Sequence, residues 1–263
     1  MSDKQVVTSR ENPYIKRLDA LLRQKKAREE SGLFVLEGAR LCLDAIQAGL
    51  PVESVCLTPV AFEKYPGLAA LTGVAPQVVW VGETLAGRLG DTQNSQGVFA
   101  VLRTSALPVL EKVEADGRYL LLHRVRDPGN LGGILRTAAA LGASGAFLCG
   151  CAEHTAPKVL RASMGGVFRL PLMQVGEMAA QIQLLGDLGI GTYAAAAREE
   201  ASAPSILSEP GGKGVLIGNE GDGLPVELID VCKDAVAIPM KTGSESLNAA
   251  MAAGILLWEM MKG

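Results

Sequence analysis

Two patterns of hydrophobic positions alternate along this chain of 263 residues. Short, continuous apolar runs alternate with longer segments in which apolar residues recur every three or four positions. The first pattern is typical of buried strands, and the second is typical of helices that cover a sheet. The alternation therefore predicts an α/β protein.

The first part of the chain, residues 1–103, predicts a small α/β/α sandwich. It begins with a helical pattern over 12–30, in which Ile15, Leu18 and Leu22 lie on one apolar stripe. Strands and further helices are predicted to follow in alternation. The strands lie at 34–37, 54–57, 77–81 and 97–102. One helix follows the first of these strands and runs to 48, and two more lie at 61–71 and 83–89. Residues 104–117, which include Pro108 and clustered charge, are predicted to form a linker.

Residues 118–263 predict a second domain with a mostly parallel sheet covered on both faces. Its predicted strands lie at 119–125, 145–150, 170–175, 191–197, 214–218 and 235–240. Its predicted helices lie at 130–141, 157–163, 177–188, 225–232 and 246–261. This alternation of strands and helices is that of a larger α/β unit, and we expect the second domain to contain the main ligand site.

Composition adds limits on partners and location. The net charge is −3, so any attraction to nucleic acid must be local. The five cysteines lack metal-ligand spacing, which favours reduced thiols. The most apolar stretch, 247–261, is interrupted by Asn248 and Glu259 and is shorter than the roughly 20 residues of a membrane span. Because no apolar signal segment follows the charged first residues, we expect a cytoplasmic protein.

The first motif that carries chemistry is VRDPGNLGGILRTA at 125–138. It contains a sequence that is typical of a turn, Asp127-Pro128-Gly129-Asn130, in which Asp or Asn can cap the following helix. Arg136 follows in an otherwise apolar helical segment, where a guanidinium suits a phosphate or a developing alkoxide. The plainer alternative for Arg136 is a salt bridge to a carboxylate such as Asp127 or Glu220.

The second and third motifs follow predicted strands near the end of the chain. LIGNEGDGLP at 216–225 is a glycine-rich turn, and such turns let the backbone approach a ligand closely. Its spacing is not that of a dinucleotide-binding or a Walker motif. IPMKTGSESLNAAMAAGI at 238–255 leads from a strand through Ser244-Glu245-Ser246 into a helix rich in small residues. Polar residues at the carboxyl ends of strands build ligand sites in α/β sheets, so the three motifs predict one composite pocket.

The order and wording of these three motifs resemble the SpoU (TrmH-type) RNA 2′-O-ribose methyltransferases, a branch of the knotted SPOUT superfamily. The resemblance is strongest over 118–263, and LFVLEGARLCLDAI at 33–46 and NSQGVFAVL at 94–102 resemble the RNA-binding domain that precedes this unit in ribosomal-RNA members. It implies a deep trefoil knot in the second domain, an exception to ordinary topology. One departure is His123, which stands where an aspartate is common.

The resemblance also implies a cofactor, S-adenosyl-L-methionine, and a set of site residues. The positions that match the family's active site are Asn130, Arg136, Glu220, Ser246 and Asn248. The positions implied to bind the cofactor, mainly through backbone groups, are Met164, Gly165, Gly218, Asn219, Gly221, Ile238, Met240, Ser246 and Leu247. No metal is implied.

The implied activity is methylation of a ribose 2′-hydroxyl in structured RNA, with ribosomal RNA favoured by the N-terminal domain. Glu220 would order Arg136, which the family proposal makes a general base. A guanidinium releases a proton reluctantly, so Arg136 as a phosphate clamp stays an alternative. A transfer-RNA target, a non-catalytic RNA-binding or assembly factor and a nucleotide-dependent oxidoreductase are further alternatives, and the absent G-x-G-x-x-G motif argues against the last.

Two partners are expected. Basic residues on the N-terminal helix should contact RNA phosphates, with a solvated helix face as the alternative. They are Arg17, Arg23, Lys25, Lys26 and Arg28. A second copy of the chain should pack against the first and last helices of the second domain, as the family implies and as the small residues at 249–254 allow.

Overall fold

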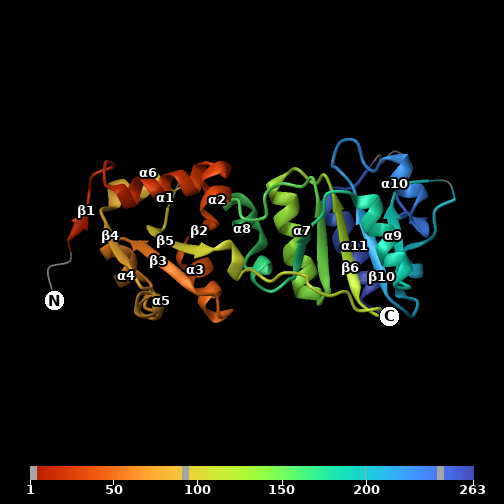
Figure 1. The fold of residues 1–263 in the computed structure, drawn as a ribbon, viewed down its shortest axis with the longest axis horizontal. Helices are drawn as coiled ribbons and strands as arrows, with labels where there is room; N and C mark the ends of the chain where they lie inside the picture. The colour runs from red at the N-terminus through yellow and green to blue at the C-terminus, as the bar shows by residue number, and fades with distance from the viewer. Residues whose placement is uncertain (1–4, 91–94, 199, 242–245) are drawn as a thin grey trace. The chain divides into compact units, whose positions relative to one another are not determined.

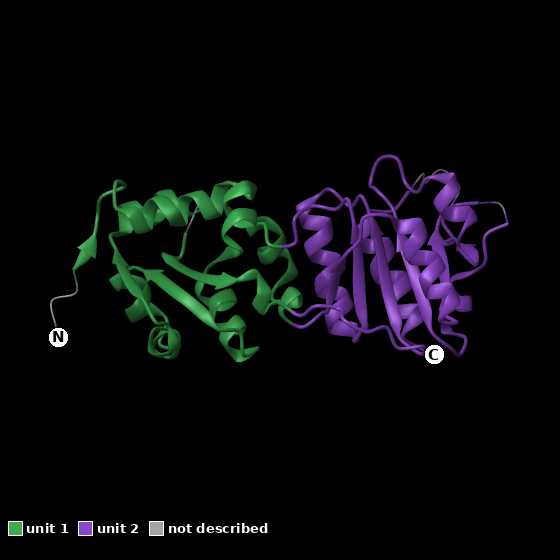
Figure 2. Ribbon diagram, viewed as in Figure 1, with its two compact units in different colours: residues 1–107, 155–168 green, residues 108–154, 169–263 purple. Residues whose placement is uncertain are grey.

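The computed structural model describes residues 5–90, 95–198, 200–241 and 246–263. The chain forms two compact units (Figure 2). Unit 1 comprises Met1–Leu107 and Thr155–Phe168, and unit 2 comprises Pro108–His154 and Arg169–Gly263. The sequence placed a linker at 104–117, but Leu110 from this stretch is buried in the core of unit 2.

Unit 1 contains a five-stranded mixed sheet with the order β1-β4-β3-β5-β2. The strands are β1 (Val6–Val7), β2 (Leu33–Glu37), β3 (Val52–Leu57), β4 (Val78–Val81) and β5 (Val98–Arg103). β5 runs antiparallel to both β2 and β3, while β4 is parallel to β1 and β3. The two-residue β1 was not predicted, because so short an edge strand has no hydrophobic period of its own.

The predicted N-terminal helix is two helices, α1 (Pro13–Arg23) and α2 (Lys25–Ser31), separated by Gln24 in an extended conformation. The Asn12 side chain accepts a hydrogen bond from the Tyr14 amide and caps α1. The other helices of unit 1 are α3 (Ala39–Gln47), α4 (Pro59–Lys64), α5 (Leu68–Val74), α6 (Glu83–Leu89) and α8 (Pro157–Ser163). The predicted stripe on α1 packs with β2, β5 and α6 into one apolar cluster.

Unit 2 contains a six-stranded sheet with the order β11-β9-β10-β6-β7-β8, and every pairing in it is parallel. The strands are β6 (Arg118–His123), β7 (Gly145–Cys149), β8 (Leu172–Gln174), β9 (Gly191–Ala195), β10 (Lys213–Ile217) and β11 (Asp234–Val236). β7 and β10 are buried along their whole length, as continuous apolar runs predict. The predicted α/β class with a mostly parallel second sheet is confirmed.

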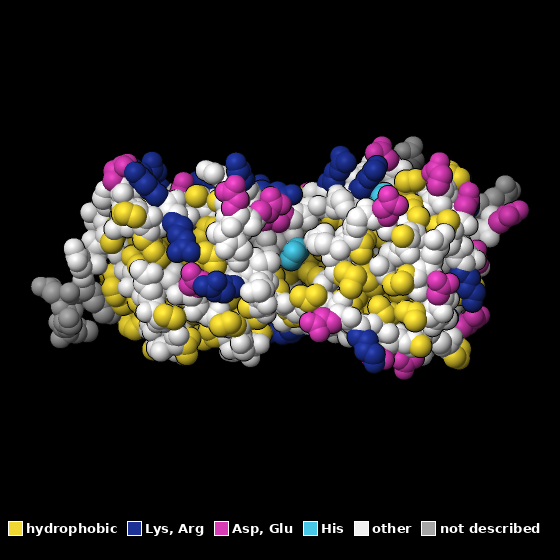
Figure 3. Space-filling view, in the orientation of Figure 1, with side chains coloured by type: hydrophobic (Ala, Val, Ile, Leu, Met, Phe, Trp, Pro, Cys, Tyr) yellow, Lys and Arg dark blue, Asp and Glu magenta, His cyan; other side chains and the backbone are white. Residues whose placement is uncertain are grey.

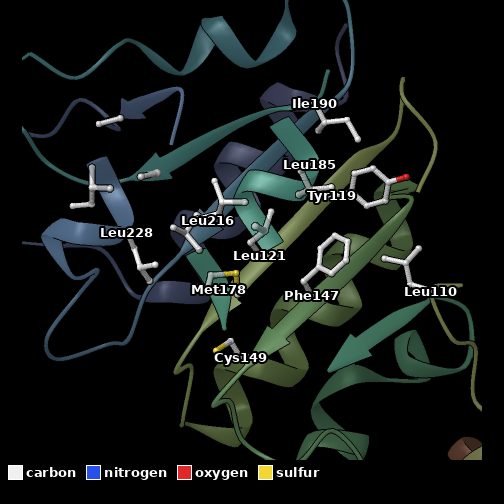
Figure 4. Close-up of a cluster of buried hydrophobic side chains, with 14 residues drawn as sticks. Leu110, Tyr119, Leu121, Phe147, Cys149, Met178, Leu185, Ile190, Leu216 and Leu228 are labelled. Carbon is white, nitrogen blue, oxygen red and sulfur yellow. The ribbon is translucent and has the colours of Figure 1, made fainter. Parts of the chain in front are cut away.

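Helices lie on both faces of this sheet (Figure 1). They are α7 (Pro128–Leu141), α9 (Met178–Asp187), α10 (Val226–Asp230) and α11 (Ala249–Met260). Residues of α9 and α10 pack with Tyr119, Phe147 and Leu216 into a buried cluster on one face (Figure 4). On the other, α11 packs against α7 and β10. Threading of the carboxyl end through a knot stays a prediction of the resemblance.

The structure also bears on the membrane prediction. No helix of the described residues is long and apolar enough to cross a membrane.

Candidate functional site

The three sequence motifs begin at the carboxyl ends of strands in unit 2. β6 ends at His123 before the first motif, β10 ends at Ile217 within the first two residues of the second, and β11 ends at Val236 before the third. β6 and β10 are hydrogen-bonded neighbours, with Ile217 in register with Leu122. The first two motifs therefore leave the sheet side by side.

A chain of side-chain hydrogen bonds joins all three motifs. The Asn248 Nδ2 donates to Asn130 Oδ1 at 2.8 Å, and the Asn130 Nδ2 donates to Glu220 Oε1 at 3.0 Å. These residues are up to 118 positions apart in the sequence. The structure thus brings together three of the predicted active-site residues, one from each motif.

The direction of this chain follows from the carboxylate at its end. An ionised Glu220 only accepts hydrogen bonds, so Asn130 must turn its amide NH₂ toward it. The carbonyl oxygen of Asn130 then faces Asn248, which must in turn present its own NH₂. The Asn248 oxygen is left to accept hydrogen bonds from the amides of Ala250 and Met251 at the start of α11. One negative charge therefore orients both amides and the helix cap.

Glu220 accepts hydrogen bonds from several groups of the first motif and from its neighbour Asn219 in the second. Besides Asn130, the backbone amides of Arg126 and Asp127 donate to its carboxylate at 3.4 and 3.3 Å, and the Asn219 Nδ2 donates at 3.4 Å. Partial burial acts to raise the pKa of Glu220, but the bonds from Asn130 and the backbone amides outweigh it, and the pKa is lowered. The group is therefore ionised at neutral pH.

The glycine-rich turn after β10 is built around Asn219. Its side-chain oxygen accepts from the amides of Gly221 and Asp222, and its Nδ2 donates to the carbonyl of Arg124 at 2.9 Å. The Asn219 backbone also exchanges two hydrogen bonds with Gly223. A Cβ on Gly218 would lie 2.5 Å from the Gly223 oxygen, so this tight turn requires glycine there. Asn219 and Gly221, predicted as cofactor residues, thus shape the loop.

α7 carries the first motif, and its start differs slightly from the prediction. Asp127 is the N-cap, its Oδ1 accepting from the Asn130 amide at 2.8 Å, and the helix begins at Pro128 rather than at Asn130. Proline is well suited to the first position of a helix because its missing N–H is not needed there.

Arg136 does not pair with Glu220, contrary to the prediction. Its side chain is exposed and makes no hydrogen bond or ion pair with any described residue. Glu220 binds the first turn of α7, and six residues of helix place Arg136 about 9 Å further along the axis. The plainer alternative, a salt bridge from Arg136 to Asp127 or Glu220, is also absent among these residues.

The third motif leads into α11 through exposed residues. Ser246 and Leu247 are exposed, while Ser244 and Glu245 lie outside the described residues. The small residues of α11 face α7 within the same chain. A Cβ on Gly133 of α7 would lie 3.6 Å from Ala250, and one on Gly254 would lie 3.8 Å from Thr137.

Of the remaining predicted cofactor residues, three follow β11 in unit 2. β11 ends at Val236, so Ile238 and Met240 lie beyond the strand rather than within it. Met240 and Leu247 are exposed, and Ile238 is half-buried. The backbone N–H groups of Ile238, Met240 and Leu247 donate to no described residue. This segment thus offers apolar surface next to available backbone donors.

Met164 and Gly165 belong instead to unit 1. Both have a positive φ, 46° and 81°, and they end α8. Met164 lines a cavity of about 200 Å³ with Glu37 and Arg161, whose side chains form an ion pair at 3.2 Å. Because the other predicted cofactor residues lie in unit 2, a cofactor role for these two stays a prediction.

His123 ends β6, where the resemblance leads one to expect aspartate. It is buried, and neither ring nitrogen has a hydrogen-bond partner among the described residues. Burial, followed by the nearby charge of Arg124, lowers its pKa. The imidazole is therefore neutral at pH 7 and contributes no charge to the site.

The predicted RNA-binding residues of the N-terminal helices are mostly paired. Each exposed cation has a carboxylate partner: Arg17 pairs with Glu53, Arg23 with Asp19, Lys25 with Glu29 and Lys26 with Glu30. Arg28 is buried, and its Nη1 donates to the carbonyl of Leu21 at 2.7 Å. Arg28 therefore holds α2 against α1 and is not available at the surface.

Sequence reasoning missed three backbone groups that contribute to the site. The backbone amides of Arg126 and Asp127 bind Glu220, and the carbonyl of Arg124 binds Asn219. Arg124 has a φ of 56°, unusual for a residue other than glycine, and this turns the chain between β6 and α7. The pattern of side chains in the sequence does not predict which backbone groups make such contacts.

Comparison with known proteins agrees with this geometry. Residues 117–258 match the model of the SpoU rRNA methylase family, and residues 12–100 match an MRM3-like substrate-binding domain. The chain is 35% identical to an uncharacterised tRNA/rRNA methyltransferase of Synechocystis, over 98% of this chain and 94% of that protein. It is 30% identical to a 23S rRNA (uridine-2′-O)-methyltransferase of Streptomyces viridochromogenes, over 97% and 91%.

A solved structure shares the whole fold. The AdoMet-bound rRNA methyltransferase of Sinorhizobium meliloti superposes with a TM-score of 0.84 at 32% identity, covering 97% of each chain. Both the family model and the near-complete relatives include the stretch that holds the hydrogen-bond chain of Asn248, Asn130 and Glu220. The chain therefore belongs to the SpoU rRNA methylase family.

Proposed function

We propose that this protein transfers a methyl group from S-adenosylmethionine to a ribose 2′-hydroxyl of ribosomal RNA. The observation that carries the proposal is the hydrogen-bond chain from Asn248 through Asn130 to Glu220, which draws the three family motifs into one place. The names of the relatives, which are 23S rRNA 2′-O-methyltransferases, support the reaction and the substrate class. The five unpaired cysteines support a cytoplasmic location.

The residues after β11 fit a donor with a flat apolar ring and polar ends. Exposed Met240 and Leu247 offer aliphatic surface for the ring. The N–H groups of Ile238, Met240 and Leu247, which donate to no described residue, can donate hydrogen bonds to the polar atoms of the cofactor. Gly218 allows the chain after β10 to turn back tightly. The cofactor, when bound, would supply a methyl group on a positively charged sulfur.

The protein's own groups would position the ribose and stabilise charge. Arg136 is an exposed guanidinium without a partner among the described residues, so it can bind an RNA phosphate in a bidentate manner and stabilise a developing alkoxide. Ser246 adds an exposed hydroxyl near the start of α11. Asn130 has both amide ends occupied, so we assign it to holding the motifs together. Positioning of this kind can supply much of a rate enhancement.

Replacing Arg136 tests the proposed chemistry. We expect Arg136→Ala to lose most methyl transfer to ribosomal RNA while binding S-adenosylmethionine normally by calorimetry. Arg136→Lys keeps the charge but loses the bidentate fork, so full activity of that variant would argue against both an arginine base and a bidentate clamp. Lys262→Ala, which removes an exposed cation of the same unit, is the matched control.

Two alternatives have distinct outcomes in the same experiment. A non-catalytic assembly factor would bind RNA but transfer no methyl group from a labelled donor. A transfer-RNA enzyme would methylate transfer RNA in preference to ribosomal RNA supplied at equal concentration.

We also propose a homodimer that packs through α7 and α11. α11 is apolar nearly all round, and while its small residues face α7, Met251, Ile255 and Trp258 are 62%, 40% and 58% exposed. Their spacing places them on one stripe of the helix, which is typical of a surface that another chain covers.

Sedimentation tests the dimer. Met251→Glu combined with Trp258→Glu should give a monomer at micromolar concentration, where the wild type should sediment as a dimer. Val226→Glu is the control, because Val226 is a similarly exposed apolar residue of unit 2, on α10. A wild-type monomer would contradict the proposal.

A further inference from the structure

A cavity of about 300 Å³ lies between α1 and α6 of unit 1. Its apolar lining comes from Ile15 of α1 and from Leu85 and Leu89 of α6, three residues of the buried core of this unit. The rest of its lining is charged. A cavity with an apolar floor and a charged rim fits a ligand that presents both a carbon surface and ionised groups.

The charges on the rim are mainly positive. Arg10, Lys16, Arg23 and Arg88 line the cavity, and Asp19 is the one carboxylate among the described residues that do so. On the face of unit 1 drawn in Figure 3, basic and acidic side chains are interspersed. The cavity is therefore a local concentration of positive charge on a chain with a net charge of −3.

Helical geometry explains why Lys16 and Arg23 of α1 line the cavity while Arg17 does not. Lys16, Asp19 and Arg23 lie at spacings of three and four residues and so share the flank of α1 that faces α6. Arg17 is rotated by about 100° from Lys16 and pairs with Glu53 of β3 instead. The basic residues of α1 are thus divided between two surfaces.

Two of the four cations have no partner in the part of the chain that the structure describes. Arg10 and Arg88 are exposed, and their side chains make no hydrogen bond or ion pair with any described residue. By contrast, Lys25 and Lys26 on α2 each pair with a glutamate four residues later. Unpaired guanidinium groups can bind an anion without first giving up a carboxylate.

The other two cations have supporting roles. The Arg23 Nε donates to Asp19 Oδ1 at 2.8 Å, and its Nη2 donates to the carbonyl of Arg88 at 3.0 Å. Arg23 therefore ties α1 to α6 and sets the width of the cavity. Among the described residues, Lys16 pairs with Glu11 alone, and this pair is fully at the surface, where an incoming phosphate can compete for the ammonium.

We propose that this cavity binds the sugar–phosphate backbone of the RNA substrate, with Arg10 and Arg88 as its main phosphate contacts. The proposal rests on the proposed function and places the RNA surface on the α1–α6 side of unit 1, away from the paired lysines of α2. The phosphates meet the guanidinium groups, and the apolar floor formed by Ile15, Leu85 and Leu89 accommodates the carbon face of a ribose.

Two double variants of equal charge test it. Arg10→Gln with Arg88→Gln, and Lys25→Gln with Lys26→Gln, each remove two positive charges from exposed positions of unit 1. The full-length proteins are titrated with a labelled transcript of large-subunit ribosomal RNA at several salt concentrations. Loss of two phosphate contacts should reduce the slope of log K against log salt by about 1.4 to 1.8. This corresponds to roughly 25- to 60-fold weaker binding at 0.1 M salt.

We expect that loss for the arginine pair and a change of less than about 3-fold for the lysine pair, whose charges are already balanced by glutamates. Equal losses in both variants would overturn the proposal, as would normal RNA binding by the arginine pair. Unchanged thermal midpoints and unchanged calorimetric binding of S-adenosylmethionine show that both variants are folded. If the wild type binds the donor but neither binds nor methylates RNA, the proposed function itself fails, which is a different result.

Discussion

Exchanging the hydrogen-bonding groups of Asn130 and Glu220 tests whether their contact holds the motifs together. In Asn130→Asp, a second carboxylate would face Glu220 where an amide now donates at 3.0 Å. In Glu220→Gln, the charge that orients the chain of amides is lost. In the combined variant, the glutamine amide introduced at position 220 can donate to the carboxylate introduced at position 130. That carboxylate can still accept from Asn248, so the connection is restored with its donor and acceptor exchanged.

The expected size follows from the separation and exposure of the two groups. Two like charges 3 Å apart repel by roughly 1.4 kcal/mol in water and by about 5.5 kcal/mol at an effective dielectric constant of 20. Glu220 is exposed, so we take a value near the lower end and add about 1 kcal/mol for the lost hydrogen bond. Asn130→Asp should therefore destabilise unit 2 by about 2–3 kcal/mol, and Glu220→Gln by about 1 kcal/mol.

The double variant should recover most of this loss. Only the Asp127 amide then lacks its acceptor, because it shares the oxygen that becomes an NH₂ group in glutamine. We expect the combined change to be about 1 kcal/mol, which corresponds to a coupling energy of about 2–3 kcal/mol. Changes at independent sites add within about 0.5 kcal/mol, so the difference is measurable.

The assay needs to report on unit 2 alone. The chain has two tryptophans, Trp80 in unit 1 and Trp258 in unit 2, so a Trp80→Phe background leaves one fluorescent reporter. Urea unfolding of the four proteins at one concentration gives the coupling energy. Lowering the pH should also reduce the penalty of Asn130→Asp, because one of two facing carboxylates then takes a proton. Additive free energies and a pH-independent penalty would refute the reasoning.

Three further predictions concern single residues of unit 2. Gly218→Ala should lower the thermal midpoint and the calorimetric affinity for the methyl donor, because its Cβ would lie 2.5 Å from a backbone oxygen. Gly221→Ala, whose Cβ would have its nearest contact at 3.4 Å, should leave both unchanged. Asn248→Ala should destabilise unit 2 by about 1–2 kcal/mol, because α11 loses its cap. Ser246→Ala should leave the stability unchanged, so a fall in its methylation rate would reflect an effect on the reaction and not on folding. His123 has a lowered pKa and is buried neutral, so stability should fall as the pH drops below about 6.5, where the unfolded chain takes up the proton. His123→Leu should reduce that slope by up to about 1.4 kcal/mol per pH unit in urea titrations, and an unchanged slope would contradict the assignment.

The sequence predicted the elements of both units because hydrophobic period and strand length agree in them. β7 and β10 are continuous apolar runs, and α9 has a clear start and end, so each was placed within a few residues. The break at Gln24 was missed because the apolar and charged pattern continues across it. β11 was predicted too long, since AVAIPM reads as one apolar run although pairing with β9 ends at Val236.

The site was only partly predictable. Asn130, Glu220 and Asn248 were identified from the motifs, and the structure joins them by hydrogen bonds. That Glu220 bonds to Asn130 and not to Arg136 was not predictable. A motif that contains a carboxylate and an arginine suggests an ion pair, and it does not show how far the helix separates the two side chains. The contributions of the Arg126 and Asp127 amides depend on backbone conformation after β6, which side-chain identity does not specify.

The absence of a Glu220–Arg136 pair among the described residues fits the role that we propose for Arg136. A guanidinium already bound to a carboxylate would have to break that contact before it could bind a phosphate, and the affinity would fall by the strength of the pair. Here Glu220 is satisfied by amide donors, and Arg136 stands about 9 Å further along α7 with its donors available. In the proposed mechanism, the carboxylate thus organises the loops through neutral groups, and the full positive charge of Arg136 is left for the substrate. The same separation holds within the described part of unit 1, where Arg23 ties α1 to α6 and Arg10 and Arg88 stay unpaired.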